Sequence, residues 1–202
     1  MSASPLLPEE LKALVDKAQQ GDTEAFGKIY DAYLTPVYRY VVFRFPIELT
    51  EDLVADIFVK AWEKLGSYRS YDNVPFSAWL FRIARHTVVD AYRRDRGFEE
   101  ISEELADTDE RNDPKAQTER RLSVAQVRLA INRLPRYYRE ILLLFYVSGL
   151  SHAEMAKSLR VTEGAIRILK FRALRRLEAL LPQGSPHQPG KLKQKPFSRV
   201  TG

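Results

Sequence analysis

Basic side chains recur along one predicted helix near the C-terminal end of the chain. Arg167, Lys170 and Arg172 lie in the stretch TEGAIRILKFRALRRL, which spans 162–177. Guanidinium and ammonium groups bind phosphate oxygens and donate hydrogen bonds to the edges of DNA bases. The chemistry that these residues offer is therefore binding, and nucleic acid is the expected partner.

Two short helices joined by a tight turn would position these side chains. Ser151 and Glu154 have the spacing of a capping box, which predicts the start of the first helix. Arg160 and Val161 form the turn, and Thr162 is a good N-cap for the second helix. Apolar residues expected to face the core recur at helical spacing: Ile166, Leu169, Ala173 and Leu177. We therefore predict a helix-turn-helix, whose second helix enters the major groove of DNA.

A solvated helical hairpin is the competing interpretation of the same stretch. Runs of Arg and Lys are usually solvated faces, and Arg160 stands where a glycine often supplies a left-handed backbone. An arginine is able to use a different turn, but the motif is less regular for it. The residues of this stretch alone leave both interpretations open.

Composition limits the function classes. The chain has 202 residues with a net charge of +5, and 45% of them are hydrophobic, which suits a soluble protein of one or two domains. There is no cysteine, and the three histidines are scattered. Neither a Ser/His/Asp grouping nor a glycine loop that cradles phosphate is present. We therefore expect no catalytic residue, no metal site and no cofactor, and a protein that is not an enzyme.

The chain also lacks signals for a membrane. No apolar run is long enough to span a bilayer, and the N-terminus lacks the basic-then-apolar plan of a signal peptide. These observations predict a cytoplasmic protein without membrane insertion.

The N-terminal half has the periodicity of packed helices. A first helix is expected over 9–19, and Asp22 or Thr23 caps a second. The aromatic segment 37–45 is compatible with a strand, but helical neighbours favour a helix, with Pro36 as a kink or a first-turn residue. A further helix is expected to begin at Thr50.

Two acids lie one turn apart on the polar side of that helix. The helix dipole explains acids in a first turn, which accounts well for Asp52 and less well for Asp56. A surface that contacts a partner is the alternative explanation.

A loop with aromatic residues precedes a basic helix expected over 78–94. Tyr68 lies in the loop over 66–74, and Arg82, Arg85 and His86 lie in the helix. Basic groups that neutralise phosphates, combined with aromatic rings that stack on bases, are typical of single-stranded nucleic acid binding. The alternative is a solvated basic helix whose Tyr and Trp side chains, Trp79 among them, only pack inside, and the residues alone leave this choice open.

An acidic segment separates the two halves. Residues 98–118 are acidic, lack sustained helical periodicity and contain Pro114, which predicts a flexible linker. Helices are expected again over 119–132 and 137–148, and the Pro-, Gly- and Lys-rich tail is expected to be disordered. The predicted fold class is all-α, with two helical domains joined by this linker and the helix-turn-helix in the second.

Three stretches resemble one protein family, the extracytoplasmic-function (group IV) sigma factors of bacterial RNA polymerase. EDLVADIFVKAWEKL is similar to the family's region 2.2, FSAWLFRIARHTVVDAYRR is similar to regions 2.3 and 2.4, and the segment 131–177 is similar to region 4. The resemblance covers 10–181. It implies a region 2 domain over 9–97, the linker over 98–118, a region 4 domain over 119–182 and a tail over 183–202.

The resemblance also implies partners and site residues. A member of this family binds core RNA polymerase, directs it to promoter DNA and helps to open the duplex, and is usually held by an anti-sigma protein. Positions that match the polymerase-binding surface are Asp52, Leu53, Asp56 and Phe58. Positions that match the minus-ten element surface are Tyr68, Arg69, Asn73, Phe76, Trp79, Arg82, Arg85, His86 and Arg93. Positions that match the minus-thirty-five element surface are Thr162, Glu163, Ala165, Arg167, Lys170 and Arg172.

The chain departs from the family's pattern at several of its positions. Ala55 stands where the family usually has Gln, so one contact with the polymerase is expected to be missing. In the second helix of the helix-turn-helix, the departures are Ala165, Ile168, Leu169 and Lys170. The promoter preference of other members is therefore not transferable.

Two other functions compete. A LuxR-type transcriptional regulator carries a similar Gly-Leu-Ser-x-x-Glu-x-Ala pattern, but it predicts a receiver or ligand domain, and the N-terminal half has no alternation of strands and helices. A sigma-like adaptor that only binds proteins is the third possibility, which an assay must separate from the first.

Overall fold

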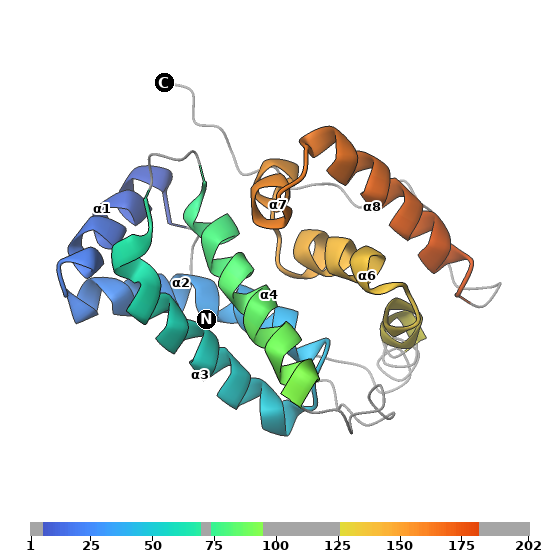
Figure 1. Ribbon diagram of the computed structural model, residues 1–202, viewed down its shortest axis with the longest axis horizontal. Coiled ribbons are helices and arrows are strands. Elements are labelled where there is room, and N and C mark those ends of the chain that lie inside the picture. The colour runs from blue at the N-terminus through green and yellow to red at the C-terminus, as the bar shows by residue number, and fades with distance from the viewer. Residues whose placement is uncertain (1–5, 70–73, 95–125, 182–202) are drawn as a thin grey trace, which may run out of the picture.

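Helices joined by short turns make up the residues that the computed structural model describes, namely 6–69, 74–94 and 126–181. No strand occurs in these ranges, which confirms the all-α class. The N-terminal half contains α1 (Pro8–Gln19), α2 (Thr23–Val42), α3 (Ile47–Lys64), the 3-10 turn η1 (Leu65–Ser67) and α4 (Phe76–Arg94) (Figure 1). The C-terminal half contains a helix over 126–132, α6 (Arg136–Leu142), the π-helical turn η3 (Leu143–Val147), α7 (His152–Leu159) and α8 (Glu163–Glu178). The predicted linker over 98–118 and the predicted tail over 183–202 lie outside the described residues.

Helix α2 is a single helix of 20 residues that continues through Pro36. Asp22 caps it by accepting hydrogen bonds from the backbone N–H groups of Glu24 and Ala25, at 2.9 and 3.0 Å. The helical interpretation of 37–45 is confirmed as far as Val42, and of the two roles expected for Pro36, a kink or a first-turn residue, its place inside the helix excludes the second.

Helix α3 begins at Ile47, three residues before the predicted start at Thr50. The Thr50 hydroxyl donates to the carbonyl of Pro46 at 2.9 Å, one turn earlier, so it lies inside the first turn and does not cap the helix. The prediction was wrong because Pro46, whose fixed φ favours the residue before a helix, already sets the start.

The core of the N-terminal half lies between α2, α3 and α4. Ile29, Ile57, Ala61 and Leu80 have no exposed surface. Aromatic pairs continue this core toward its edge, with ring centroids 4.9 Å apart for Phe26 and Trp62 and 4.5 Å apart for Tyr30 and Phe58. The resulting packing fixes the relative positions of α3 and α4, which carry most of the predicted site residues.

The helix-turn-helix forms as predicted. The Ser151 hydroxyl accepts from the N–H of Glu154, whose carboxylate accepts from the N–H of Ser151 in return, and the Thr162 hydroxyl accepts from the N–H of Ala165. The sequence left open whether Arg160 would use a different turn from the left-handed one that glycine often supplies. It does not, because Arg160 adopts the left-handed conformation with φ 57° and ψ 48°. Such a conformation costs a non-glycine residue about 1–2 kcal/mol.

The helix predicted over 137–148 is continuous only as far as Leu142. The next five residues form a π-helical turn, in which Leu143 and Leu144 are fully buried. After this turn, the N–H of Leu150 donates a hydrogen bond to the carbonyl of Leu144 at 3.0 Å. The wider turn lets the chain leave α6 and enter α7 while both leucines stay in the core.

A buried ion pair joins the two halves. Arg44, at the end of α2, is 3% exposed, and its guanidinium lies 2.6 Å from the carboxylate of Glu140 in α6. The Tyr40 hydroxyl donates to the same carboxylate at 2.7 Å, and burial raises the pKa of Tyr40, which keeps the hydroxyl protonated. Arg128 also donates to the carbonyl of Val42. A buried charge is tolerated when it is matched in this way.

A second contact brings α7 against α4. The Ser77 hydroxyl donates to the carboxylate of Glu154, and Arg82 donates to the carbonyl of Lys157 at 2.9 Å. Figure 1 shows α7 beside the first turns of α4. The capping residue of α7 therefore also connects the two halves.

We predict that Glu140→Ala destabilises the protein by about 3–5 kcal/mol, because Arg44 then stays buried without its carboxylate. Equilibrium urea denaturation measures this change. Glu178→Ala is the matched control, since Glu178 and Arg175 form an exposed ion pair at 3.3 Å, for which a loss of about 0–1 kcal/mol is expected. Equal stability of the two variants would contradict the proposed importance of the buried pair.

Candidate binding surfaces

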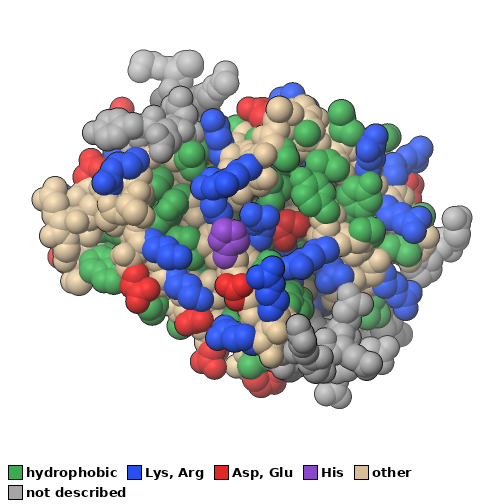
Figure 2. Space-filling model, viewed as in Figure 1, with side chains coloured by type: hydrophobic (Ala, Val, Ile, Leu, Met, Phe, Trp, Pro, Cys, Tyr) green, Lys and Arg blue, Asp and Glu red, His purple; other side chains and the backbone are tan. Residues whose placement is uncertain are grey.

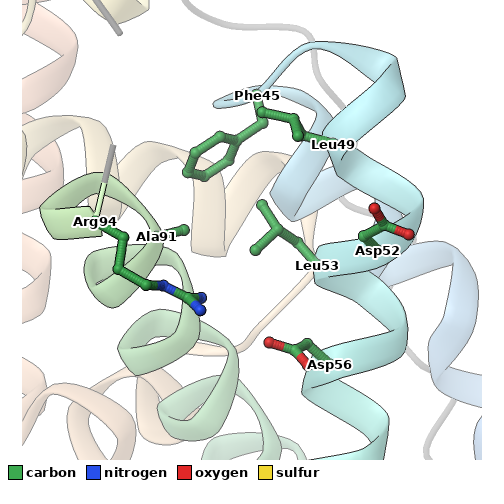
Figure 3. Close-up of a pocket in the computed structure, with 7 residues that line it drawn as sticks. All are labelled: Phe45, Leu49, Asp52, Leu53, Asp56, Ala91 and Arg94. Atoms are coloured by element: carbon green, nitrogen blue, oxygen red, sulfur yellow. The ribbon is translucent and has the colours of Figure 1, made fainter. Parts of the chain in front are cut away.

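A groove between α3 and α4 carries the predicted polymerase-binding acids. It encloses a volume of about 430 Å³ and is lined by Phe45, Leu49, Asp52, Leu53, Asp56, Ala91 and Arg94. Figure 3 shows Leu53 and Asp56 extending from α3 toward Ala91 and Arg94, which extend from α4. Asp52 is exposed and Asp56 is half-buried, with Lys60 3.4 Å from its carboxylate. The groove thus has an apolar floor with two carboxylates on one side.

Phe58 does not reach this groove. Its ring is 4% exposed and packs against Tyr30 in the core, so its contact with the polymerase stays a prediction that this packing does not favour. The reason is that Phe58 belongs to the apolar face of α3, whereas Asp52 and Asp56 belong to the polar face. Leu53 is also buried, at 8% exposed, but it forms part of the groove floor.

Three aromatic residues predicted for the minus-ten surface form a cluster. The ring centroids of Tyr68, Phe76 and Trp79 lie 5.2–5.5 Å apart in all three pairings. Tyr68 and Phe76 are buried, at 7% and 3% exposed, and the Tyr68 hydroxyl donates to the carbonyl of Val74 at 3.0 Å. Trp79 is half-buried. In this conformation the rings of Tyr68 and Phe76 pack on each other and on Trp79, as the packed alternative describes, and their contact with the minus-ten element stays a prediction.

The basic residues of this surface differ in how accessible they are. His86 and Arg93 are exposed, and Arg85 is half-buried. Arg93 lies 3.7 Å from Asp90. Burial and the neighbouring Arg85 lower the pKa of His86. Arg82 is half-buried by its contact with α7.

The loop before α4 supplies two more of the predicted residues. Arg69 is exposed, and it donates to the carbonyl of Gly66 at 2.6 Å. Asn73 lies outside the described residues. Figure 2 shows that Lys and Arg side chains gather along α4 and again along α8 on the same face of the molecule.

Helix α8 carries the predicted minus-thirty-five surface. Thr162, Glu163, Arg167 and Arg172 are exposed, and Ala165 is half-buried. Arg167 and Glu163 form an ion pair at 3.2 Å, one turn apart. Lys170 instead turns back on its own domain, with its ammonium nitrogen 3.8 Å from the centre of the Phe145 ring.

Comparison with known proteins agrees with this arrangement of helices. The family described as Sigma-70 region 2 matches residues 29–98, and Sigma-70, region 4 matches residues 125–177. NccH of Alcaligenes xylosoxydans xylosoxydans, an RNA polymerase sigma factor, is 32% identical over 86% of this chain and 96% of its own length. BldN of Streptomyces coelicolor, an ECF RNA polymerase sigma factor, is 38% identical over 84% of this chain and 65% of its own length.

This chain is an extracytoplasmic-function sigma factor.

A solved structure supports the same conclusion about this sigma factor. CnrH, a sigma factor of Cupriavidus metallidurans, has been solved in complex with the cytosolic domain of CnrY. It superposes with a TM-score of 0.64 and 27% identity, covering 85% of this chain and 96% of CnrH. The match of the N-terminal half to region 2 leaves the LuxR-type alternative without support, because that alternative needs a different domain there.

Sequence reasoning missed several residues of the sigma factor's surfaces. Phe45, Leu49, Ala91 and Arg94 complete the groove, and only the packing of α4 against α3 reveals them. Ile168 and Phe171 are 55% and 63% exposed on α8, although both are large and apolar. The sequence could have indicated their exposure, because both positions lie outside the predicted core-facing stripe of α8.

Two absences concern the described residues only. No helix within 6–69, 74–94 or 126–181 is both long and apolar enough to cross a bilayer. The same ranges contain no cluster of three or more His, Cys, Asp or Glu side chains that would suit a metal ion.

We predict that Asp52→Arg combined with Asp56→Arg abolishes binding to core RNA polymerase, because it reverses the charge on one wall of the groove. The fold is expected to persist, since neither carboxylate is fully buried. Co-elution with core polymerase in size-exclusion chromatography measures the binding, and circular dichroism verifies the fold.

Glu51→Arg combined with Glu63→Arg is the matched control. Both glutamates are exposed on α3, neither lines the groove, and the pair changes the net charge equally. The control is expected to co-elute like the wild type. Wild-type co-elution of the Asp52 and Asp56 variant would refute the assignment of the groove.

Proposed function

We propose that this sigma factor binds core RNA polymerase through the groove between α3 and α4, directs it to specific promoters and helps to open the DNA. The observation that carries the proposal is the groove itself, in which Asp52 and Asp56 border an apolar floor. Its shape and charge suit a basic, amphipathic helix of the polymerase, whose apolar side chains would cover Leu53 and whose cations would pair with the acids.

DNA binding is divided between the halves. Helix α8 holds the duplex at the minus-thirty-five element, where Arg167 and Arg172 contact phosphates and base edges. Arg85, His86 and Arg93 of α4 bind the backbone of the separated strand at the minus-ten element, and Trp79 offers an aromatic face to an unstacked base. This work is binding, so we propose no catalytic role, and we place the protein in the cytoplasm with the polymerase. The domain bounds that we propose are those given by the resemblance to the family.

Access to the minus-ten surface requires a change of conformation. Arg82 donates to Lys157 and Ser77 to Glu154, so α7 occupies part of the surface of α4 to which DNA would bind. We propose that the halves separate when the sigma factor joins the polymerase. An anti-sigma protein is the expected partner of the unbound sigma factor, because the related CnrH is found in a complex with CnrY.

Run-off transcription tests the proposed function directly. Purified protein is added to core RNA polymerase on a pool of upstream DNA fragments from the same genome. Specific transcripts that depend on the protein are expected. Tight binding to core without transcripts would identify an adaptor, and absence of binding to core would refute the proposal.

We predict that Arg167→Ala weakens binding of the holoenzyme to promoter DNA and lowers the salt dependence of that binding, because one cation that displaces counterions is lost. The slope of log K against log salt is expected to fall by about 0.9 for one phosphate contact. Fluorescence anisotropy over a range of salt concentrations measures both effects.

Arg176→Ala is the matched control for this prediction. It removes the same side chain from an exposed position of α8 that lies about half a turn around the helix from Arg167. The control is expected to keep the wild-type slope. An unchanged slope for Arg167→Ala would show that Arg167 does not contact the DNA.

A further inference from the structure

The outer surface of α8 is unusual because it presents large apolar side chains to solvent. Phe171 is 63% exposed, which among the large hydrophobic residues of the described ranges only Leu7 exceeds, and Ile168 is 55% exposed. The two lie three residues apart on one face of the helix. Figure 2 shows hydrophobic side chains exposed beside α8, interleaved with Lys and Arg.

Two basic side chains near the apolar pair have partners within their own domain. Arg167 pairs with Glu163, and Lys170 is held over the ring of Phe145. At Gly164, one turn before Ile168, a Cβ atom would meet only the Thr162 hydroxyl oxygen, at 3.9 Å, so the helix backbone is accessible to a partner there. Ile168 and Phe171 thus form an apolar patch on the exposed side of α8.

Charge around this apolar pair favours DNA as its partner. Arg167, Arg172 and Arg175 are exposed on the same helix, and Glu163 is the one acid among the exposed residues of its first three turns. A basic surface of this kind attracts a polyanion. An apolar pair that lies between arginines on a recognition helix therefore faces the major groove.

The major groove offers one apolar group, which is the C5-methyl group of thymine. We propose that Ile168 and Phe171 read thymine methyl groups in the minus-thirty-five element, so that apolar contact supplies specificity at A·T pairs. This inference rests on the proposed function, since it assigns specificity within the same DNA surface. It extends that function to two residues outside the predicted site and names the base that they recognise.

Deoxyuridine tests the proposal because it differs from thymidine only by the missing methyl group and pairs identically. Holoenzyme made from the full chain and core polymerase first selects bound duplexes from a library with a randomised minus-thirty-five element. Each selected thymine is then replaced singly by deoxyuridine. We expect the affinity of the wild type to fall about fourfold at the positions that contact Ile168 or Phe171, as for one buried methyl group.

Variants assign each methyl group to a side chain. Ile168→Ala is expected to bind the thymine and deoxyuridine duplexes equally at one position, and Phe171→Ala is expected to do so at another. Arg172→Ala is the control, because it should weaken binding to both duplexes by the same factor. Both apolar residues are exposed, so their replacement should leave the fold intact, which thermal melting verifies.

Three outcomes are distinguishable. Loss of affinity on methyl removal, abolished by the apolar variants, supports the proposal. Equal affinity of the wild type for thymine and deoxyuridine at every position overturns it and leaves the apolar pair to a protein partner. Co-elution with core polymerase is measured separately, so failure to bind core would refute the proposed function rather than this inference.

Discussion

The buried guanidinium of Arg44 constrains how the two halves of the protein fit together. Its position at the end of α2 leaves it 3% exposed, and the carboxylate that neutralises it comes from Glu140, 96 residues later in the chain. Desolvation of a buried ion pair offsets much of the attraction between its charges. If the halves separate, both charges regain water, so a junction of this kind holds one geometry without making separation prohibitively costly.

The second junction couples the same geometry to DNA binding. The carboxylate of Glu154 accepts a hydrogen bond from the N–H of Ser151, which stabilises the start of α7. The same carboxylate accepts from the Ser77 hydroxyl of α4, so it also connects the helix-turn-helix to the N-terminal half. Arg82 is committed to Lys157 in this arrangement. In this arrangement α7 covers part of α4 while α8 stays exposed, so a promoter that binds α4 as proposed would compete with α7.

Local signals explain which parts of the structure the sequence predicted. Ser151 with Glu154 and Thr162 with Ala165 interact within four residues, so the start of each helix in the helix-turn-helix follows from neighbouring residues alone. The helical halves and their apolar faces follow from periodicity for the same reason. The groove, the Arg44–Glu140 pair and the burial of Phe58 depend on helices that are distant in the chain, and neither periodicity nor motif spacing specifies those contacts. At Arg160 the sequence left the turn open, and the structure closes it with local backbone bonds: the N–H groups of Arg160 and Val161 both donate to the carbonyl of Ala156.

Helix α8 illustrates how fold and specificity are separated on one element. Ile166 and Ala173 have no exposed surface and fasten the helix to its domain, so substitution there would leave a cavity or a clash. Ile168 and Phe171 face solvent, where most substitutions change stability by less than about 0.5 kcal/mol. Promoter preference can therefore change through the outer residues while the inner ones keep the helix in place. On α8 the residues that hold the fold and the residues proposed to read the promoter are therefore different, and Ile168, a departure from the family's pattern, belongs to the second group.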